Sequence, residues 1–260
     1  MKLAEQIEQY LLEQTRRLFP ESPDLDDAET VHRMRVASRR LRVGLEFFAD
    51  GFDPRECRQL LRQIARLGDA LGVVRVLDVN LTLLRGGSVR NIPSNRAEQL
   101  ALLRKRVPPR TELEELYRAM TTAKIASRVE TLVVQRRGKT DGLAALADLR
   151  RVLRRCLERF DEKHREVAFH KLRIAVKKYR YGLEIAETVF GADVGGRMES
   201  VKTLQELMGT CHDVEVLMER LPKGPLKKYF AKEHRRRYET VKKFLDGGRR
   251  WVKKVKLDNE

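Results

Sequence analysis

A stretch near the amino terminus, residues 31–48, carries one histidine and three arginines on one side of a predicted helix. At about 100° per residue these side chains form a stripe beside an apolar face. Exposed helices usually alternate basic and acidic residues four apart, because like charges repel. An unbalanced row about 15 Å long therefore indicates a binding site for a linear polyanion rather than a single phosphate. The members of this first basic stripe are His32, Arg35, Arg39 and Arg42.

The same pattern returns at residues 169–186, which align with residues 31–48 without a gap. Each copy ends in Gly-Leu-Glu, at 44–46 and 182–184. Arginine forks match phosphate oxygens, and lysine adds a mobile point charge, so both copies suit the same ligand. A pattern that recurs in the same order indicates an internal duplication. The second basic stripe consists of His170, Arg173, Lys177 and Arg180.

A leucine-rich segment with a shared glycine follows each copy, at residues 60–79 and 201–216. The matched pairs are Gly72 with Gly209, Arg75 with His212, and Asp78 with Glu215. We expect each glycine to end a helix. The predicted helices are 55–71 and about 74–84 in the first copy, and 197–209 and 213–220 in the second.

The repeated pattern H-[KR]-[LM]-R-x-A-x-[KR]-[KR]-x-R-x-G-L-E, followed each time by G-x-x-[RH]-x-x-[DE], resembles the CHAD domain (conserved histidine α-helical domain). The resemblance covers about residues 3–246. It implies two four-helix-bundle halves related by pseudo-twofold symmetry, whose basic residues face a central groove or pore that binds inorganic polyphosphate. One position departs from the family pattern: Val76 stands where the family has an acid, whereas Asp213 keeps that acid in the second copy.

The composition also indicates a polyanion partner. The 260 residues include 55 Lys or Arg and 38 Asp or Glu, which gives a net charge of +17. Nucleic acid, polyphosphate and an anionic membrane all fit this charge. Residues 223–260 hold 14 basic and 5 acidic side chains, so 14 − 5 = +9 of the excess lies there. Net charge alone therefore does not locate the site. The repeated pattern locates it instead.

Cysteine usage and the amino terminus predict a soluble cytoplasmic protein. The three cysteines show no CxxC spacing, which fits a reducing compartment better than a disulfide framework. Glutamates interrupt the first 14 residues where a signal peptide needs an apolar run. No segment approaches transmembrane length. The family resemblance adds polyphosphate granules as a location. The cysteines are Cys57, Cys156 and Cys211.

Helical periodicity runs through the chain and strand-like alternation does not persist, so the predicted fold is all-α. The resemblance divides it into two pseudo-symmetric four-helix-bundle halves. We expect the halves to be residues 1–137 and 138–246, with a boundary at the Gly-rich segment 138–142, and a basic tail at 247–260. Pro108-Pro109 are expected to divide the helical region 96–137 into two helices.

Other chemistries are less well supported by the residues. Repeated histidines can bind metal, but arginines and lysines surround His32 and His170, and metal sites need neutral or anionic neighbours. Cationic neighbours also keep these imidazoles neutral, as donors to an anion or as packing groups. Adjacent helical residues point in different directions, so Cys211, His212 and Asp213 are not a catalytic triad. The segment 136–140 lacks the upstream glycine of a phosphate-binding loop, and no pair of carboxylates has a catalytic setting.

Two other functions remain as alternatives. A nucleic-acid-binding protein fits the charge, although aromatic residues make up only 6% and form no stacking platform among basic residues. An accessory domain or enzyme acting on phosphorylated substrates is the other alternative. The tail at 235–256 could also contact a duplex backbone or an anionic membrane.

We therefore predict non-catalytic binding of inorganic polyphosphate between the two basic stripes, without metal or cofactor. A second row of arginines at 58, 62 and 66 would face the first stripe if the two helices pack side by side. In addition to the eight stripe residues, the predicted binding residues are Arg33, Arg40, Lys171, Lys178, Arg62, Arg66 and Lys202.

Overall fold

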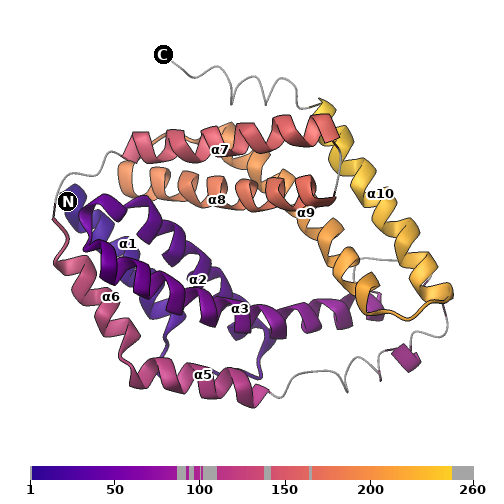
Figure 1. Cartoon of the computed structure of the whole chain (residues 1–260), viewed down its shortest axis with the longest axis horizontal. Helices are drawn as coiled ribbons and strands as arrows, with labels where there is room; N and C mark the ends of the chain where they lie inside the picture. Colours follow the sequence, from indigo (N-terminus) through magenta and orange to yellow (C-terminus); the bar gives the residue numbers. More distant parts are fainter. Residues whose placement is uncertain are drawn as a thin grey trace. The chain divides into compact units, whose positions relative to one another are not determined.

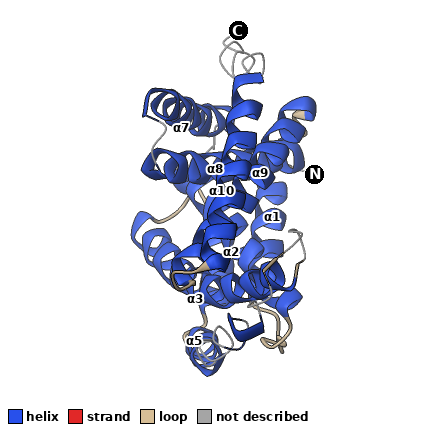
Figure 2. Ribbon diagram, turned by 90° about the vertical axis from the view of Figure 1, so that its right-hand side faces the viewer, coloured by secondary structure: helices blue, strands red, loops and turns tan. Residues whose placement is uncertain are grey.

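The computed structural model describes residues 2–86, 92–93, 97–99, 101, 110–137, 142–163 and 166–247. Helices account for nearly all of these residues, and none of the described residues lies in a β-strand (Figure 2). The prediction of an all-α fold is therefore confirmed. None of the described helices is both long and apolar enough to cross a membrane.

The chain divides into two compact units, and each unit combines segments that are far apart in the sequence. The first unit takes its described residues from 1–78, 106–145 and 185–192, and the second from 79–105, 146–184 and 193–260. Among the described helices, three contribute to both units: α3 (Pro54–Arg85), α7 (Gly142–Lys163) and α8 (Glu166–Phe190). The predicted division into duplicated halves stays a prediction, and its boundary segment 138–141 and the tail from 248 onward lie outside the described residues.

The first unit is built on helix α1, which packs against α2 and α6, while α5 packs against α6 (Figure 1). The apolar face predicted for the helix of the first stripe is buried in this unit, with Met34, Leu41, Leu45 and Phe48 at most 1% exposed. The bounds are α1 Leu3–Leu18, α2 Ala28–Phe47, the 3₁₀ helix η1 Ala49–Gly51, α5 Arg110–Thr122 and α6 Ile125–Val134.

Helix α2 begins directly after Asp27, in an acidic segment at residues 24–29. The Asp27 carboxylate caps it by accepting hydrogen bonds from the backbone of Glu29 at 3.3 Å and of Thr30 at 2.8 Å. It also accepts one from the Thr30 hydroxyl at 2.8 Å. These hydrogen bonds lower the pKa of Asp27. A negative charge also complements the positive end of the helix dipole. These interactions stabilise the start of α2, where the first stripe begins.

Helix α2 runs antiparallel to the first part of α3. Ser38 Oγ donates to the Ile64 carbonyl at 3.3 Å, and the Cys57 thiol lies 4.0 Å from the Leu45 carbonyl. Higher numbers on one helix therefore meet lower numbers on the other. A Cβ on Gly68 would collide with Ser38 Oγ, so a glycine is needed for this close approach. The backbones come close enough for side chains of α2 to bond carbonyls of α3.

The expected breaks at Gly72 and Gly209 are wrong. Helix α3 is continuous through Gly72, and α9 (Gly195–Arg220) is continuous through Gly209. A glycine inside a helix costs only about 1 kcal/mol relative to alanine, which packing of the flanking leucines outweighs. Another break was missed, because Lys124 adopts a left-handed conformation with φ of 51° and separates α5 from α6. The Pro108-Pro109 pair lies outside the described residues.

The second unit combines most of α7, most of α8, α9 and α10 (Pro225–Gly247). Helix α10 packs along α9, and both close over the carboxyl end of α3 (Figure 1). At the end of α8, Gly191 has a φ of 65° and allows the chain to reverse. The core under α9 and α10 consists of Leu83, Leu84, Val214, Leu217, Leu221, Leu226 and Phe230.

Candidate functional site

The first basic stripe is anchored to α3 through Arg35. Its guanidinium Nη1 donates to the Gly68 carbonyl at 2.8 Å and lies directly over Gly72, where a Cβ would collide with it. The small residues of α3 therefore form a seat for this half-buried arginine. A carbonyl is neutral, so the hydrogen bond orients the guanidinium without cancelling its charge.

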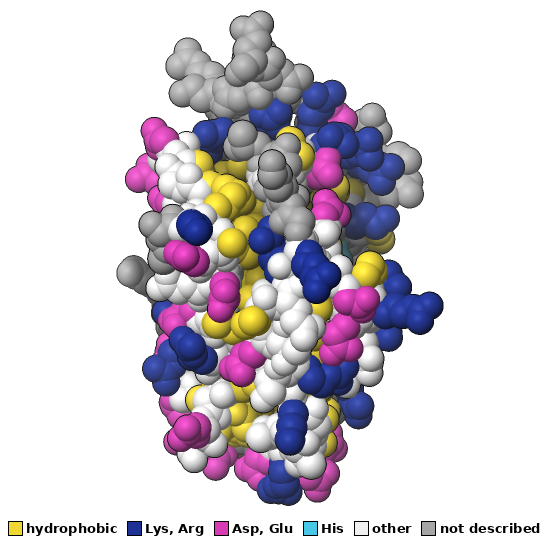
Figure 3. Space-filling view, turned by 90° about the vertical axis from the view of Figure 1, so that its left-hand side faces the viewer, with side chains coloured by type: hydrophobic (Ala, Val, Ile, Leu, Met, Phe, Trp, Pro, Cys, Tyr) yellow, Lys and Arg dark blue, Asp and Glu magenta, His cyan; other side chains and the backbone are white. Residues whose placement is uncertain are grey.

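Arg39 and Arg42 continue the stripe toward the carboxyl end of α2. Both are half-buried, and within the described part of the chain neither forms a hydrogen bond or an ion pair. Elsewhere on the surface, basic and acidic side chains are intermingled, as one face of the molecule shows (Figure 3). Two partly desolvated guanidinium groups on one helix repel each other, and an external anion would relieve this repulsion.

The other predicted residues of the first unit lie less close to the stripe. Arg33 is exposed and donates to the Thr30 hydroxyl at 3.2 Å, and Arg40 is half-buried. Arg62 and Arg66 are exposed on α3, about 120° and about 160° around the helix from Gly68. The expectation that the arginine row on α3 faces the first stripe is therefore wrong. The arginines follow a four-residue spacing, but a different side of α3, the one that carries Gly68 and Gly72, contacts α2.

The second basic stripe lies on α8. His170 is exposed, and Arg173, Lys177 and Arg180 are half-buried. Arg180 is held by its own helix, because Glu184 accepts from its Nη2 at 2.7 Å and from its Nε at 3.2 Å. Glu184 thus forms an ion pair with Arg180, one of the four residues of the second stripe. Lys171 and Lys202 are exposed and Lys178 is half-buried.

Helix α9 brings a histidine and an acid to the second stripe. The rings of His170 and His212 have centroids 6.0 Å apart, and His212 Nδ1 lies 3.0 Å from Glu215 Oε2. The hydrogen bond with His212 lowers the pKa of Glu215, and the charges of His212, His234 and Arg173 add to this effect. Glu215 is therefore a carboxylate near neutral pH. Gly209 does not accommodate a side chain as Gly72 does, since apart from its own helix backbone and chain neighbours no described atom lies within 4 Å of its Cβ position.

The two stripe histidines resist protonation. Partial burial, followed by the charge of Arg75, lowers the pKa of His32, and the charges of Arg39 and Arg35 contribute. Partial burial, followed by the charge of Arg173, lowers the pKa of His170. The cationic neighbours lower both pKa values, as predicted, and partial burial is the larger cause. Near pH 7 each ring is neutral and can donate one hydrogen bond to an anion.

Three residues near the stripes were absent from the predicted set: Arg75, His212 and His234. Arg75 acts on the pKa of His32, and His234 acts on the pKa of Glu215. The repeated G-x-x-[RH] segment carried a signal for Arg75 and His212, because both follow the shared glycine by three residues. His234 could not have been found in this way, since it comes from α10 and has no counterpart in the first repeat.

The site offers hydrogen-bond donors and positive charge rather than a nucleophile. Burial raises the pKa of Cys211 to about 12, and His212 pairs with Glu215, so Cys211 and His212 do not form a nucleophile–base pair. Among the described residues, no three histidine, cysteine, aspartate or glutamate side chains gather as a metal site. Each stripe is suited to binding phosphate oxygens.

Comparisons with known proteins agree with this architecture. A family model described as the CHAD domain matches residues 9–222. Protein Rv2226 of Mycobacterium tuberculosis is 27% identical over 237 residues, which cover 84% of this chain and 44% of that protein, so this chain spans less than half of that relative.

Two solved structures share the fold. The CHAD domain from the plant Ricinus communis has a TM-score of 0.65 and 22% identity, with coverage of 98% of this chain and 90% of that chain. PptA from Streptomyces chartreusis has a TM-score of 0.62 and 16% identity, with coverage of 94% and 98% respectively.

The two matched glycines should respond differently to substitution. Gly209→Ala should raise the free energy of unfolding by about 0.5–1 kcal/mol, because alanine favours a helix and the site is open. Gly72→Ala should show no such gain, because Arg35 must leave a hydrogen bond worth about 1 kcal/mol. Urea denaturation of both variants measures the difference. Equal stabilisation by both substitutions would contradict the role of Gly72 in making room for the Arg35 guanidinium.

Proposed function

The chain belongs to the CHAD domain family, and on that premise we propose that it binds inorganic polyphosphate without catalysing a reaction. The observation that carries the proposal is the first basic stripe. Its Arg35 is oriented by a neutral carbonyl, and its Arg39 and Arg42 form no ion pair within the described residues. An anion supplied from outside would neutralise the charges of Arg39 and Arg42.

The form of the stripe favours a chain of phosphates over a single phosphate. From His32 to Arg42 the helix rises about 15 Å, which one phosphate does not span. Each phosphate neutralised by arginine or lysine releases condensed counterions, and this release provides most of the affinity for a linear polyanion. The neutral histidines add donors at the start of each stripe.

Both stripes take part in the proposed binding, as their shared sequence pattern suggests. The groove or pore, the duplicated halves at 1–137 and 138–246, and a cytoplasmic location with access to polyphosphate granules belong to the same proposal. The family resemblance supports them.

Nucleic acid is the second candidate. The net charge of +17 and the exposed lysines and arginines of α10 favour it. Its phosphates are spaced by sugars, however, so fewer of them fit along a stripe of fixed length.

A competition experiment distinguishes the two ligands. Long-chain polyphosphate should displace labelled duplex DNA at a phosphate concentration at least about tenfold lower than that at which DNA displaces labelled polyphosphate. Fluorescence anisotropy at constant ionic strength measures both directions. Equal displacement in both directions would instead indicate a general polyanion surface.

Charge-matched variants locate the binding surface. The double variant Arg39→Gln with Lys177→Gln should weaken polyphosphate binding by about tenfold or more, because it removes one cation from each stripe. The control Arg58→Gln with Lys228→Gln removes the same charge from exposed positions outside both stripes and should weaken it by less than about threefold. Titration calorimetry compares them, and a larger loss in the control would place the site elsewhere.

The non-catalytic proposal has its own test. Polyphosphate incubated with the protein and Mg²⁺ or Mn²⁺ should keep its chain length, because the site offers donors and cations but no activated nucleophile. Gel electrophoresis of the polyphosphate measures the length. Shortening or extension that disappears when Glu215 is changed to Gln would establish an enzyme instead.

A further inference from the structure

Two histidines lie beside one carboxylate in the second unit, and the charge of a third histidine acts on the same carboxylate. His170 comes from α8, His212 from α9 and His234 from α10, and Glu215 is the carboxylate. We call these four residues the histidine cluster. The first unit has no such group, because Arg75 stands at the position of His212 in the repeated motif.

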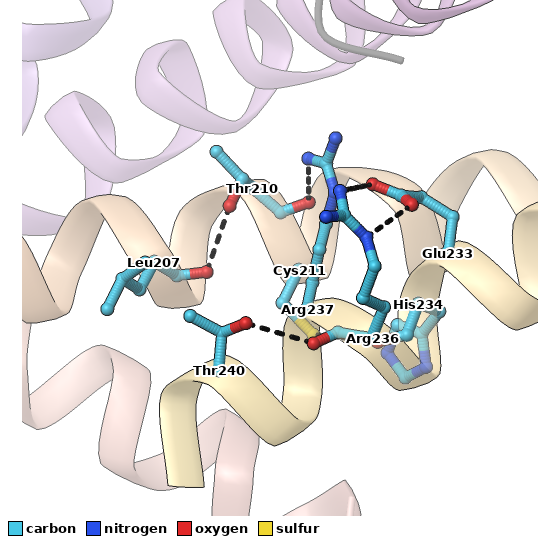
Figure 4. A network of polar contacts seen from close by, with 8 residues as sticks. All are labelled: Leu207, Thr210, Cys211, Glu233, His234, Arg236, Arg237 and Thr240. Carbon is cyan, nitrogen blue, oxygen red and sulfur yellow. Dashed lines mark hydrogen bonds and ion pairs between the residues drawn. The ribbon is translucent and has the colours of Figure 1, made fainter. Parts of the chain in front are cut away.

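Helix α10 holds its histidine in place through a polar network with α9 (Figure 4). Arg237 donates to the Thr210 carbonyl at 3.1 Å and to Glu233 at 2.7 Å, and Arg236 donates to Glu233 as well. The Cys211 thiol lies 4.0 Å from the His234 carbonyl. The cluster is thus built on helices, of which α9 and α10 are joined by this network, rather than on a loop.

Histidines make up the cluster, whereas an arginine, Arg75, occupies the matched position of the first unit. Histidine is the side chain whose ordinary pKa lies nearest to neutral pH, but arginine is always charged. While His212 is neutral, the Glu215 carboxylate places a negative charge close to Arg173. A proton on His212 cancels that charge, and a proton on His170 or His234 adds a positive one.

We propose that the second stripe binds its phosphate chain together with protons taken up by the histidine cluster, so that binding tightens as the pH falls. This inference rests on the proposed function and adds a regulation of the same site. His212 lies beside His170 on α8 and Glu215 on its own helix α9. The charges that act on His170 come from Arg173 and Lys177 on α8 and from His212 and Glu215 on α9, and His234 on α10 acts on Glu215.

The sign follows from the charges. A bound phosphate favours the imidazolium form of nearby histidines, so binding is accompanied by proton uptake. A ligand that raises a pKa binds more tightly below that pKa, and the advantage disappears as the pH rises above it. Cys211 does not interfere, because burial raises its pKa to about 12.

The experiment measures the affinity of the full chain for long-chain polyphosphate between about pH 8 and about pH 6 at constant ionic strength. On a long chain only the terminal phosphates titrate in this range, so the ligand contributes little. Wild-type protein should bind about five to ten times more tightly at the lower pH. His212→Arg should bind at the higher pH nearly as tightly as wild type does at the lower. His212→Gln should stay weak, and both variants should show a reduced pH dependence.

Proton uptake provides a readout that needs no variant. Titration calorimetry of wild-type protein near pH 6.5, in two buffers of different ionisation enthalpy, should show net uptake of about one proton per bound chain. Binding without proton uptake, or an unchanged pH dependence in His212→Arg, would overturn this inference and leave the proposed function intact. Absence of polyphosphate binding at both pH values would overturn the proposed function and this inference with it.

Discussion

The close approach of α2 and α3, secured by the bond from Arg35 to the Gly68 carbonyl, is the interaction on which the first site depends. It requires Gly68 under Ser38 and Gly72 under Arg35, since a Cβ at either position would collide with those side chains. The Gly68 carbonyl orients the guanidinium of Arg35 within the packed contact between the two helices.

The second unit positions its basic stripe through different contacts. Its glycine, Gly209, has open space beside it, and the position corresponding to Arg75 is His212, which pairs with Glu215. Its last stripe residue, Arg180, is paired with Glu184, whereas Arg42 at the matched position has no ion pair within the described residues. Two segments that share a sequence pattern thus provide sites of unequal charge, with the second more dependent on pH.

The sequence predicted the helices and the apolar face of α2, because helical spacing is a local property and a long apolar row has to be buried. It did not predict the continuity of α3 and α9, because a glycine that weakens an isolated helix can be the residue that a neighbouring helix requires. The prediction that Arg62 and Arg66 face the first stripe was wrong for a related reason. Their spacing showed that they share a face, but only the contact through Gly68 shows which face meets α2. His234 came from a helix outside the repeat, and no spacing within the repeat could indicate it.

A crystal structure of the protein with a short linear polyphosphate is the most direct test of the central claim, which is that oriented cations on α2 and α8 bind a chain of phosphates. The account predicts phosphate oxygens within hydrogen-bonding distance of Arg35, Arg39 and Arg42, and of His170, Arg173 and Lys177, with the bond from Arg35 to the Gly68 carbonyl retained. Phosphates found only along the exposed lysines and arginines of α10, with both stripes empty, would contradict it.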